Sequence, residues 1–197
     1  VVQHQASRAT AQPLTSLHSY SLMLGAMTLM HRSTRHEFET ARRMLEHLVD
    51  REQAHARPRA WLANWHALRV TQLRPVDSAA DVERALYHAR QALERDPCSP
   101  LALAVDGVLR MNLTKDFSLA SQRFEAALNS NPNEALAWLF KGVLHAFQGG
   151  RGLAEPAAER ALSLTPLDPM RHYFDSLAAT AALGDGLYAL AEQRALR

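Results

Sequence analysis

The stretch NPNEALAWLFKGVLHAFQGGRGLAEPAAERALSLTP, residues 131–166, decides the fold. It contains Pro132 near its start and ends at Pro166. These two prolines stand 34 residues apart and close successive blocks of similar pattern. Small residues recur where two short helices would have to cross closely: Gly142, Ala154, Ala158 and Ala161. Proline lacks the amide donor and clashes with the preceding turn, so Pro166 ends the second helix. The stretch therefore predicts a helix-turn-helix unit.

The preceding block repeats this order. It carries Leu103, Gly107, Arg110, Ala120, Phe124 and Ala127, with one inserted residue between its helices, so Pro97 and Pro132 are 35 residues apart. A period near 34 in successive blocks is the sequence signature of a tetratricopeptide array. The chain therefore resembles the tetratricopeptide repeat (TPR) family. This resemblance implies an all-α fold, a right-handed α-solenoid of stacked helix-turn-helix repeats.

Extended in both directions, the pattern predicts a single TPR-like array over residues 16–197, preceded by a linker over 1–15 of low apolar content. The predicted units are 16–57, 58–99, 100–134, 135–168 and 169–197. The second unit diverges, because its first helix, predicted over 58–72, is followed by a connection about eight residues longer than the standard turn. The last unit is truncated and has no closing proline, which we interpret as a fragment of a longer protein.

Composition excludes several classes of protein. The chain is 47% hydrophobic but only 7% aromatic, which favours alanine-rich helices over sheet. Cys98 is the single cysteine, so no internal disulfide can form, and we expect a cytoplasmic location. No apolar run reaches the length of a membrane span, so no membrane insertion is expected. The net charge of +2 comes from arginines spread beside acidic residues, which predicts no binding to nucleic acid.

No motif in the sequence carries catalytic or metal chemistry. The ten histidines form no HExxH motif and have no cysteine pair beside them. The glycine-rich string GGRG at 149–152 follows no strand and precedes no Lys-Ser/Thr, so it is interpreted as a turn rather than a phosphate loop. We therefore predict no catalytic residue, no metal site, no cofactor and no enzyme activity for this fragment.

A binding surface remains. In TPR arrays the first helices line a concave face, and the resemblance places there Arg59, Leu62, His66, Arg69, Leu101, Ala104, Val108, Met111, Leu136, Leu139, Val143 and Phe147. Chaperone-binding members clamp a carboxylate with Lys, Asn and Arg, where this chain has Leu136, Leu139 and Val143, so no clamp is expected. An apolar groove suits an amphipathic helix. Glutamate at Leu139 and Val143 would then block binding and leave the fold largely intact. The alternative is that these residues simply pack against adjacent repeats.

A narrower resemblance covers most of residues 17–197. This stretch resembles the repeat region that follows the catalytic or DNA-binding domain in bacterial class III adenylate cyclases and winged-helix regulators. The resemblance rests on the strings SYSLMLGAMTLMHR and WLANWHALRV, and on AFQG followed by TPLDP. This implies a non-catalytic regulatory module of a signalling protein, whose effector domain, such as an adenylate cyclase, lies outside this sequence. It would bind a protein or peptide partner or form a homodimer.

The rival hypothesis is a sensor that binds a small molecule or peptide in the groove around Met111, Val143 and Phe147. The shape of the groove separates the two functions. A closed pocket of about 300–1,000 Å³ with a few converging polar groups favours a small ligand, whereas an open groove wider than one helix favours a protein partner.

Overall fold

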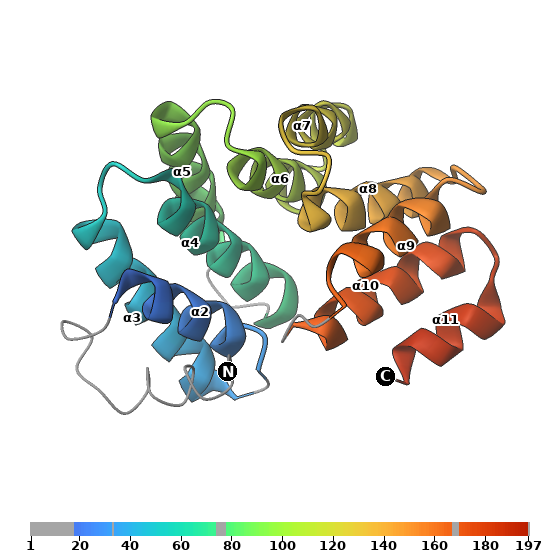
Figure 1. Cartoon of the computed structure of the whole chain (residues 1–197), viewed down its shortest axis with the longest axis horizontal. Helices are drawn as coiled ribbons and strands as arrows, with labels where there is room; N and C mark the ends of the chain where they lie inside the picture. The colour runs from blue at the N-terminus through green and yellow to red at the C-terminus, as the bar shows by residue number, and fades with distance from the viewer. Residues whose placement is uncertain (1–17, 33, 74–77, 167–169, 197) are drawn as a thin grey trace. The chain divides into compact units, whose positions relative to one another are not determined.

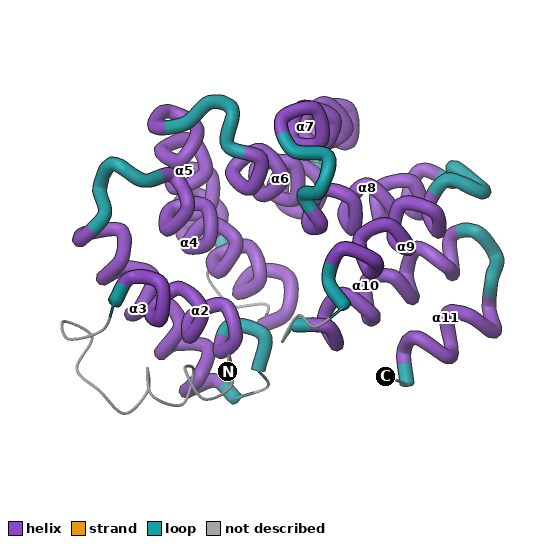
Figure 2. The backbone as a smooth tube through the Cα atoms, in the orientation of Figure 1, coloured by secondary structure: helices purple, strands orange, loops and turns teal. Residues whose placement is uncertain are grey.

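The structure is a computed structural model that describes residues 18–32, 34–73, 78–166 and 170–196. Over these residues it contains α-helices and two π-helical turns but no strand, which confirms the all-α fold class (Figure 1, Figure 2). The chain divides into two compact units, Val1–Pro97 and Cys98–Arg197, called unit 1 and unit 2 below. The linker predicted over 1–15 lies outside the described residues.

The described residues of unit 1 form two helical hairpins. The first pairs α2 (Ser19–Leu29) with α3 (Arg35–Arg51), and the second pairs α4 (Ala56–Leu68) with α5 (Ala79–Arg95) (Figure 1). A π-helical turn, η2 (Arg69–Leu73), extends α4 and takes up part of the long predicted connection, of which 74–77 lie outside the described residues.

Trp65 joins the two hairpins of unit 1. Its indole is fully buried and stacks on Phe38 of α3, with ring centroids 4.6 Å apart. The indole Nε1–H donates a hydrogen bond to the Phe38 carbonyl oxygen (2.8 Å), which satisfies the one polar group of the ring. The guanidinium carbons of Arg42 and Arg69 each lie 5.8 Å from the indole centroid. Helices α3 and α4 therefore share one core.

In unit 2, the part of the chain that the structure describes forms three helical hairpins. They are α6 (Pro100–Leu109) with α7 (Phe117–Ser130), α8 (Ala135–Gln148) with α9 (Ala154–Leu164), and α10 (Arg171–Gly184) with α11 (Tyr188–Ala195). The π-helical turn η3 (Arg110–Thr114) follows α6, and Lys115 then adopts the left-handed conformation with φ 59°. A π turn accommodates one residue more than an α turn. The inserted residue of this block therefore lies in η3.

Glycines stand where the helices of unit 2 cross, as the sequence predicts. A Cβ at Gly142 would lie 2.7 Å from the Ala154 carbonyl oxygen, and one at Gly107 would lie 2.5 Å from the Phe124 ring. A third close approach, not predicted, brings α10 against α8, since a Cβ at Gly184 would lie 2.4 Å from the Ala146 Cβ. None of these crossings has room for a larger residue without movement of a neighbour.

Helix α4 corrects one prediction. It begins at Ala56, two residues before the predicted start at Pro58. Proline is tolerated throughout the first turn, because amides there have no acceptor within the helix, so Pro58 did not have to be the first residue. Counted from Ala56, Ala63 takes the position that Gly107 and Gly142 hold in α6 and α8. The positions predicted for the binding face of α4 therefore shift by two residues.

Candidate functional site

Most residues that the sequence assigns to a binding groove are buried. The buried ones are Leu62, His66, Leu101, Ala104, Val108, Met111, Leu136, Leu139 and Val143. Helix α8 packs against both α6 and α10, and the side chains of Leu139 and Val143 are 0% and 2% exposed. A glutamate at either position would bury an unpaired charge. The expectation that these two substitutions leave the fold intact is therefore wrong.

The other predicted groove residues keep some exposure but do not come together in one site. Phe147, at the end of α8, is 56% exposed. Arg59 of α4 and Arg69, the first residue of η2, belong to the other unit and are partly exposed. Burial lowers the pKa of Arg59, and its Nε atom has no hydrogen-bond partner among the described residues.

His66 and Arg69 face α5 rather than an open groove. The His66 Nδ1–H donates to Oδ1 of Asp81 (2.8 Å), and the Nε atom of Arg69 lies 3.4 Å from Oδ2 of the same carboxylate. Asp81 and His66 are both buried. A buried carboxylate requires such partners, because burial without them is strongly unfavourable. These residues hold α4 and α5 together and are not available to a partner.

His88 of α5 lies beside this pair, and its pKa is shifted further than that of any other described histidine. Its ring stacks on His66, with centroids 5.9 Å apart and planes at 6°, and its Nδ1 is buried without a hydrogen-bond partner. Burial, together with the nearby positive charges of His66, Arg59 and Arg84, lowers the pKa of His88 to about 4. Burial also lowers the pKa of His66, against the opposing effect of Asp81.

Unit 1 should therefore lose stability in acid. Between pH 6.5 and about 4 the unfolded state binds a proton at His88 that the folded state does not, so the free energy of unfolding falls as pH falls through this window. The slope from this half-buried group is below about 1.4 kcal/mol per pH unit. Melting temperatures from pH 7.5 to 4.5 should fall less for His88→Gln than for the parent and for the exposed-site control His36→Gln. Parallel curves for all three proteins would contradict this assignment.

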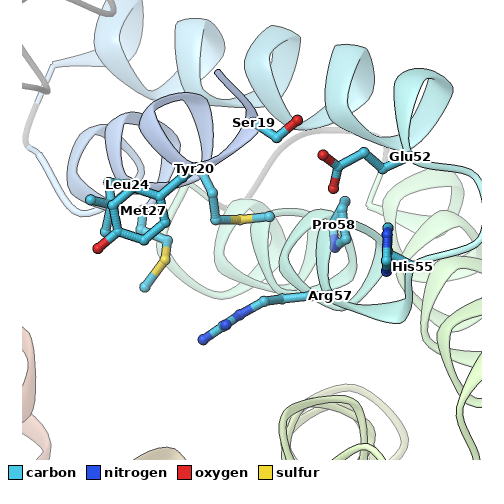
Figure 3. Close-up of a pocket in the computed structure, with 9 residues that line it drawn as sticks. Ser19, Tyr20, Leu24, Met27, Glu52, His55, Arg57 and Pro58 are labelled. Atoms are coloured by element: carbon cyan, nitrogen blue, oxygen red, sulfur yellow. The ribbon is translucent and has the colours of Figure 1, made fainter. Parts of the chain in front are cut away.

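A pocket in unit 1 is the best candidate for a binding site. It has a volume of about 360 Å³ and opens between α2, the α3–α4 turn and the start of α4 (Figure 3). We call it the α2–α4 pocket. Its lining residues are Ser19, Tyr20, Met23, Leu24, Met27, Glu52, His55, Arg57 and Pro58. One side is apolar, with α2 supplying two thioethers, a leucine and an aromatic ring. Glu52 and His55 form a polar end, and the side chain of Arg57 extends away from them (Figure 3).

The pocket lies on the repeat positions that the family resemblance assigns to binding. Tyr20, Met23 and Met27 stand at the same distances from the start of α2 as Leu101, Ala104 and Val108 from the start of α6. Arg57 is the equivalent residue of α4 and takes the place predicted for Arg59. Sequence reasoning missed all four residues. Counting each first helix from its true start would have found them.

The turn that carries the polar end is firmly placed. The His55 amide donates to the Glu52 carbonyl oxygen (3.0 Å), which closes the turn between α3 and α4. The Arg95 side chain of α5 donates its Nε–H to the Gln53 carbonyl oxygen (2.5 Å). Arg95 also donates hydrogen bonds to the carbonyl and side-chain oxygens of Gln91 within α5. The turn is therefore fixed to the end of α5. The polar end of the pocket thus lies on a turn that these hydrogen bonds hold in place.

Nothing in the described residues suggests metal chemistry or a membrane span. Over 18–32, 34–73, 78–166 and 170–196, no three His, Cys, Asp or Glu side chains are grouped so as to hold a metal ion. None of the helices in those ranges combines the length and the apolar character needed to cross a bilayer. Cys98 is exposed and forms no disulfide.

Comparison with known proteins identifies the fold. No protein-family model matches the chain, and no curated protein matches its sequence. A thermophilic TPR protein of Thermus thermophilus matches the structure with a TM-score of 0.65 and 19% identity, over 90% of this chain and 88% of that one. A chain of the APC/C hetero-tetramer Cut9–Hcn1 matches with a TM-score of 0.63 and 18% identity, over 98% of this chain and 35% of that one. The chain therefore has the fold of the tetratricopeptide repeat proteins.

Proposed function

We propose that the chain is a non-catalytic interaction module that binds a protein or peptide partner through the α2–α4 pocket. The observation that carries the proposal is the position of this pocket, on the residues of α2 and α4 that correspond to the positions for which the family resemblance predicts binding. Methionine side chains adapt to differently shaped apolar groups, and Met23 and Met27 form much of the wall. A single apolar side chain of the partner would enter the pocket as an anchor.

The wider role follows from the resemblance to repeat regions of signalling proteins. We propose that the module works in the cytoplasm of a bacterium and biases an attached effector domain, such as an adenylate cyclase or a DNA-binding domain. Partner binding or dimerisation through the repeats would transmit the signal. Light scattering over a range of concentrations measures whether the chain dimerises.

The pocket volume supports a second candidate function, the sensing of a small molecule. A volume of about 360 Å³ lies within the usual range for ligand sites, and polar side chains form part of the lining. Against this, Tyr20, His55 and Arg57 are all exposed, so the pocket is open to solvent. We therefore favour a partner side chain over an enclosed ligand. Native mass spectrometry of the purified chain would reveal a retained small molecule as an added mass.

A charge inside the pocket should abolish partner binding. Met27 is only partly buried, so Met27→Glu can fold, but it places a carboxylate where an apolar anchor would be desolvated. We expect proteins captured by the parent chain to be lost with Met27→Glu and retained with Leu153→Glu, which introduces the same charge at an exposed leucine of unit 2. Quantitative mass spectrometry of the captured proteins measures both effects. Equal capture by the parent and Met27→Glu would place the interface elsewhere.

A further inference from the structure

We infer that the α2–α4 pocket selects a partner segment in which the apolar anchor is flanked by an acidic side chain. This inference rests on the proposed function and adds the chemistry of the partner. The apolar wall supplies the affinity for the anchor, and the arginine at the mouth of the pocket, Arg57, supplies the selectivity for the flanking carboxylate.

Arg57 is placed to receive an anion. Its side chain is exposed and makes no ion pair or hydrogen bond with any described residue. In Figure 3 it extends along the open side of the pocket from α4 toward Met27 of α2, next to the place where an anchor would enter. A guanidinium matches a carboxylate in shape and can bind it through two hydrogen bonds.

The start of α4 adds to the positive potential beside Arg57. Its first turn contains no acidic residue, and the side chain of the N-cap residue His55 makes no capping hydrogen bond. The first amides of a helix carry a partial positive charge that favours a nearby anion. The helix end alone would not make a site, but here it acts together with Arg57 and the apolar pocket.

Glu52 sets the direction in which the segment binds. It lines the pocket away from Met27, close to Ser19 and opposite the guanidinium of Arg57 (Figure 3). A second acidic residue of the partner near Glu52 would be repelled, because two carboxylates that lie close together repel each other. The carboxylate of the partner is therefore expected on one side of the anchor only, the side that faces Arg57.

Selection from a peptide library tests the inference. Acetylated and amidated nonapeptides would carry Leu, Met, Phe or Ala at the centre and mixed acidic, basic and neutral residues on both sides. Because both ends are blocked, a carboxylate can come only from a side chain. The whole chain is used as bait, as the parent, as Arg57→Glu, as Arg57→Lys, and as Arg90→Glu, a charge reversal at an exposed arginine of α5.

The parent, Arg57→Lys and Arg90→Glu should enrich a large apolar centre with Asp or Glu on one side. Arg57→Glu should bind the selected peptides about fivefold to twentyfold more weakly and instead enrich Lys or Arg on that side. Two results would overturn the inference and leave the proposed function standing. One is enrichment of the apolar centre without an acidic flank, and the other is an acidic flank that Arg57→Glu leaves unchanged. Failure to enrich any apolar centre would overturn both.

Discussion

Replacing Gly142 with leucine is expected to lower the melting temperature of the chain by about 5–10 °C, through overpacking at the α8–α9 crossing. A Cβ at this position would lie 2.7 Å from the Ala154 carbonyl oxygen and 3.2 Å from the Ala158 amide nitrogen. Both contacts are with backbone atoms, so no change of rotamer can relieve them, and the two helices must separate. The better helix propensity of leucine recovers only about 1 kcal/mol.

Two controls separate the crossing from a general effect of removing a glycine. Gly142→Ala already introduces the clashing Cβ, so it should also destabilise, by less than leucine. Gly150→Ala should melt like the parent, because Gly150 lies in the following turn and its nearest neighbour for a Cβ is an ordinary contact at 3.5 Å. Thermal unfolding followed by far-UV circular dichroism measures all three variants. If Gly142→Leu melted at the same temperature as the parent, the repeat pairing of α8 with α9 would be wrong.

The repeat pattern predicted the hairpins of unit 2 because steric rules fix them locally. Glycine at Gly107 and Gly142 marks where backbones cross, and proline stops a second helix. Sequence reasoning was less exact where these marks are missing. In α4 the crossing residue is Ala63, an alanine among several, and Pro58 fits any position of the first turn, so the start of the helix could not be fixed. The close approach of Gly184 to Ala146 could not be predicted, because the two residues belong to different repeats.

The candidate site was harder to predict than the fold. Leu139 and Val143 carry no sign in the sequence of whether their face is open or covered, because an apolar residue suits both a groove and a core. Burial between α8 and its neighbours depends on how closely successive repeats approach, which periodicity does not give. The α2–α4 pocket was missed because no binding positions were assigned to the first helix of the chain and because the predicted register of α4 was two residues out. With α4 starting at Ala56, Arg57 takes the position predicted for Arg59 and lines the pocket together with Met27.

An ion network around the buried Arg194 connects the last described helix of unit 2 to α9; its second carboxylate, Glu159, is exposed. The guanidinium of Arg194, on α11, forms two hydrogen bonds to the Glu155 carboxylate of α9 (2.5 and 2.6 Å) and one to Glu159 (2.7 Å). It also donates to the Ala178 carbonyl oxygen of α10 (3.3 Å). Arg194 is only 4% exposed, and Ala191 is the only other buried residue of α11. Docking of this helix therefore depends largely on one side chain.

Arg194→Met is expected to undock α11, because it leaves Glu155 in a largely buried site without its cation. Removing one partner of a buried ion pair costs about 3–5 kcal/mol. Amides of Tyr188–Ala195 should then lose protection against hydrogen exchange by about a hundredfold or more, or down to the unfolded rate, while α6 and α7 keep theirs. Exchange read by mass spectrometry separates this local opening from global unfolding. Full protection of α11 in this variant would show that the network does not hold the helix.

Three further variants test the electrostatic explanation. Arg194→Lys keeps the charge but loses the two-pronged contact with Glu155, so protection should fall to an intermediate level. Combining Arg194→Met with Glu155→Gln removes the uncompensated carboxylate and should restore part of the protection. Arg32→Ala breaks an exposed ion pair with Glu37 and should leave the protection of α11 unchanged. If the combined variant were no better protected than Arg194→Met, lost packing rather than the unpaired charge would explain the opening of α11.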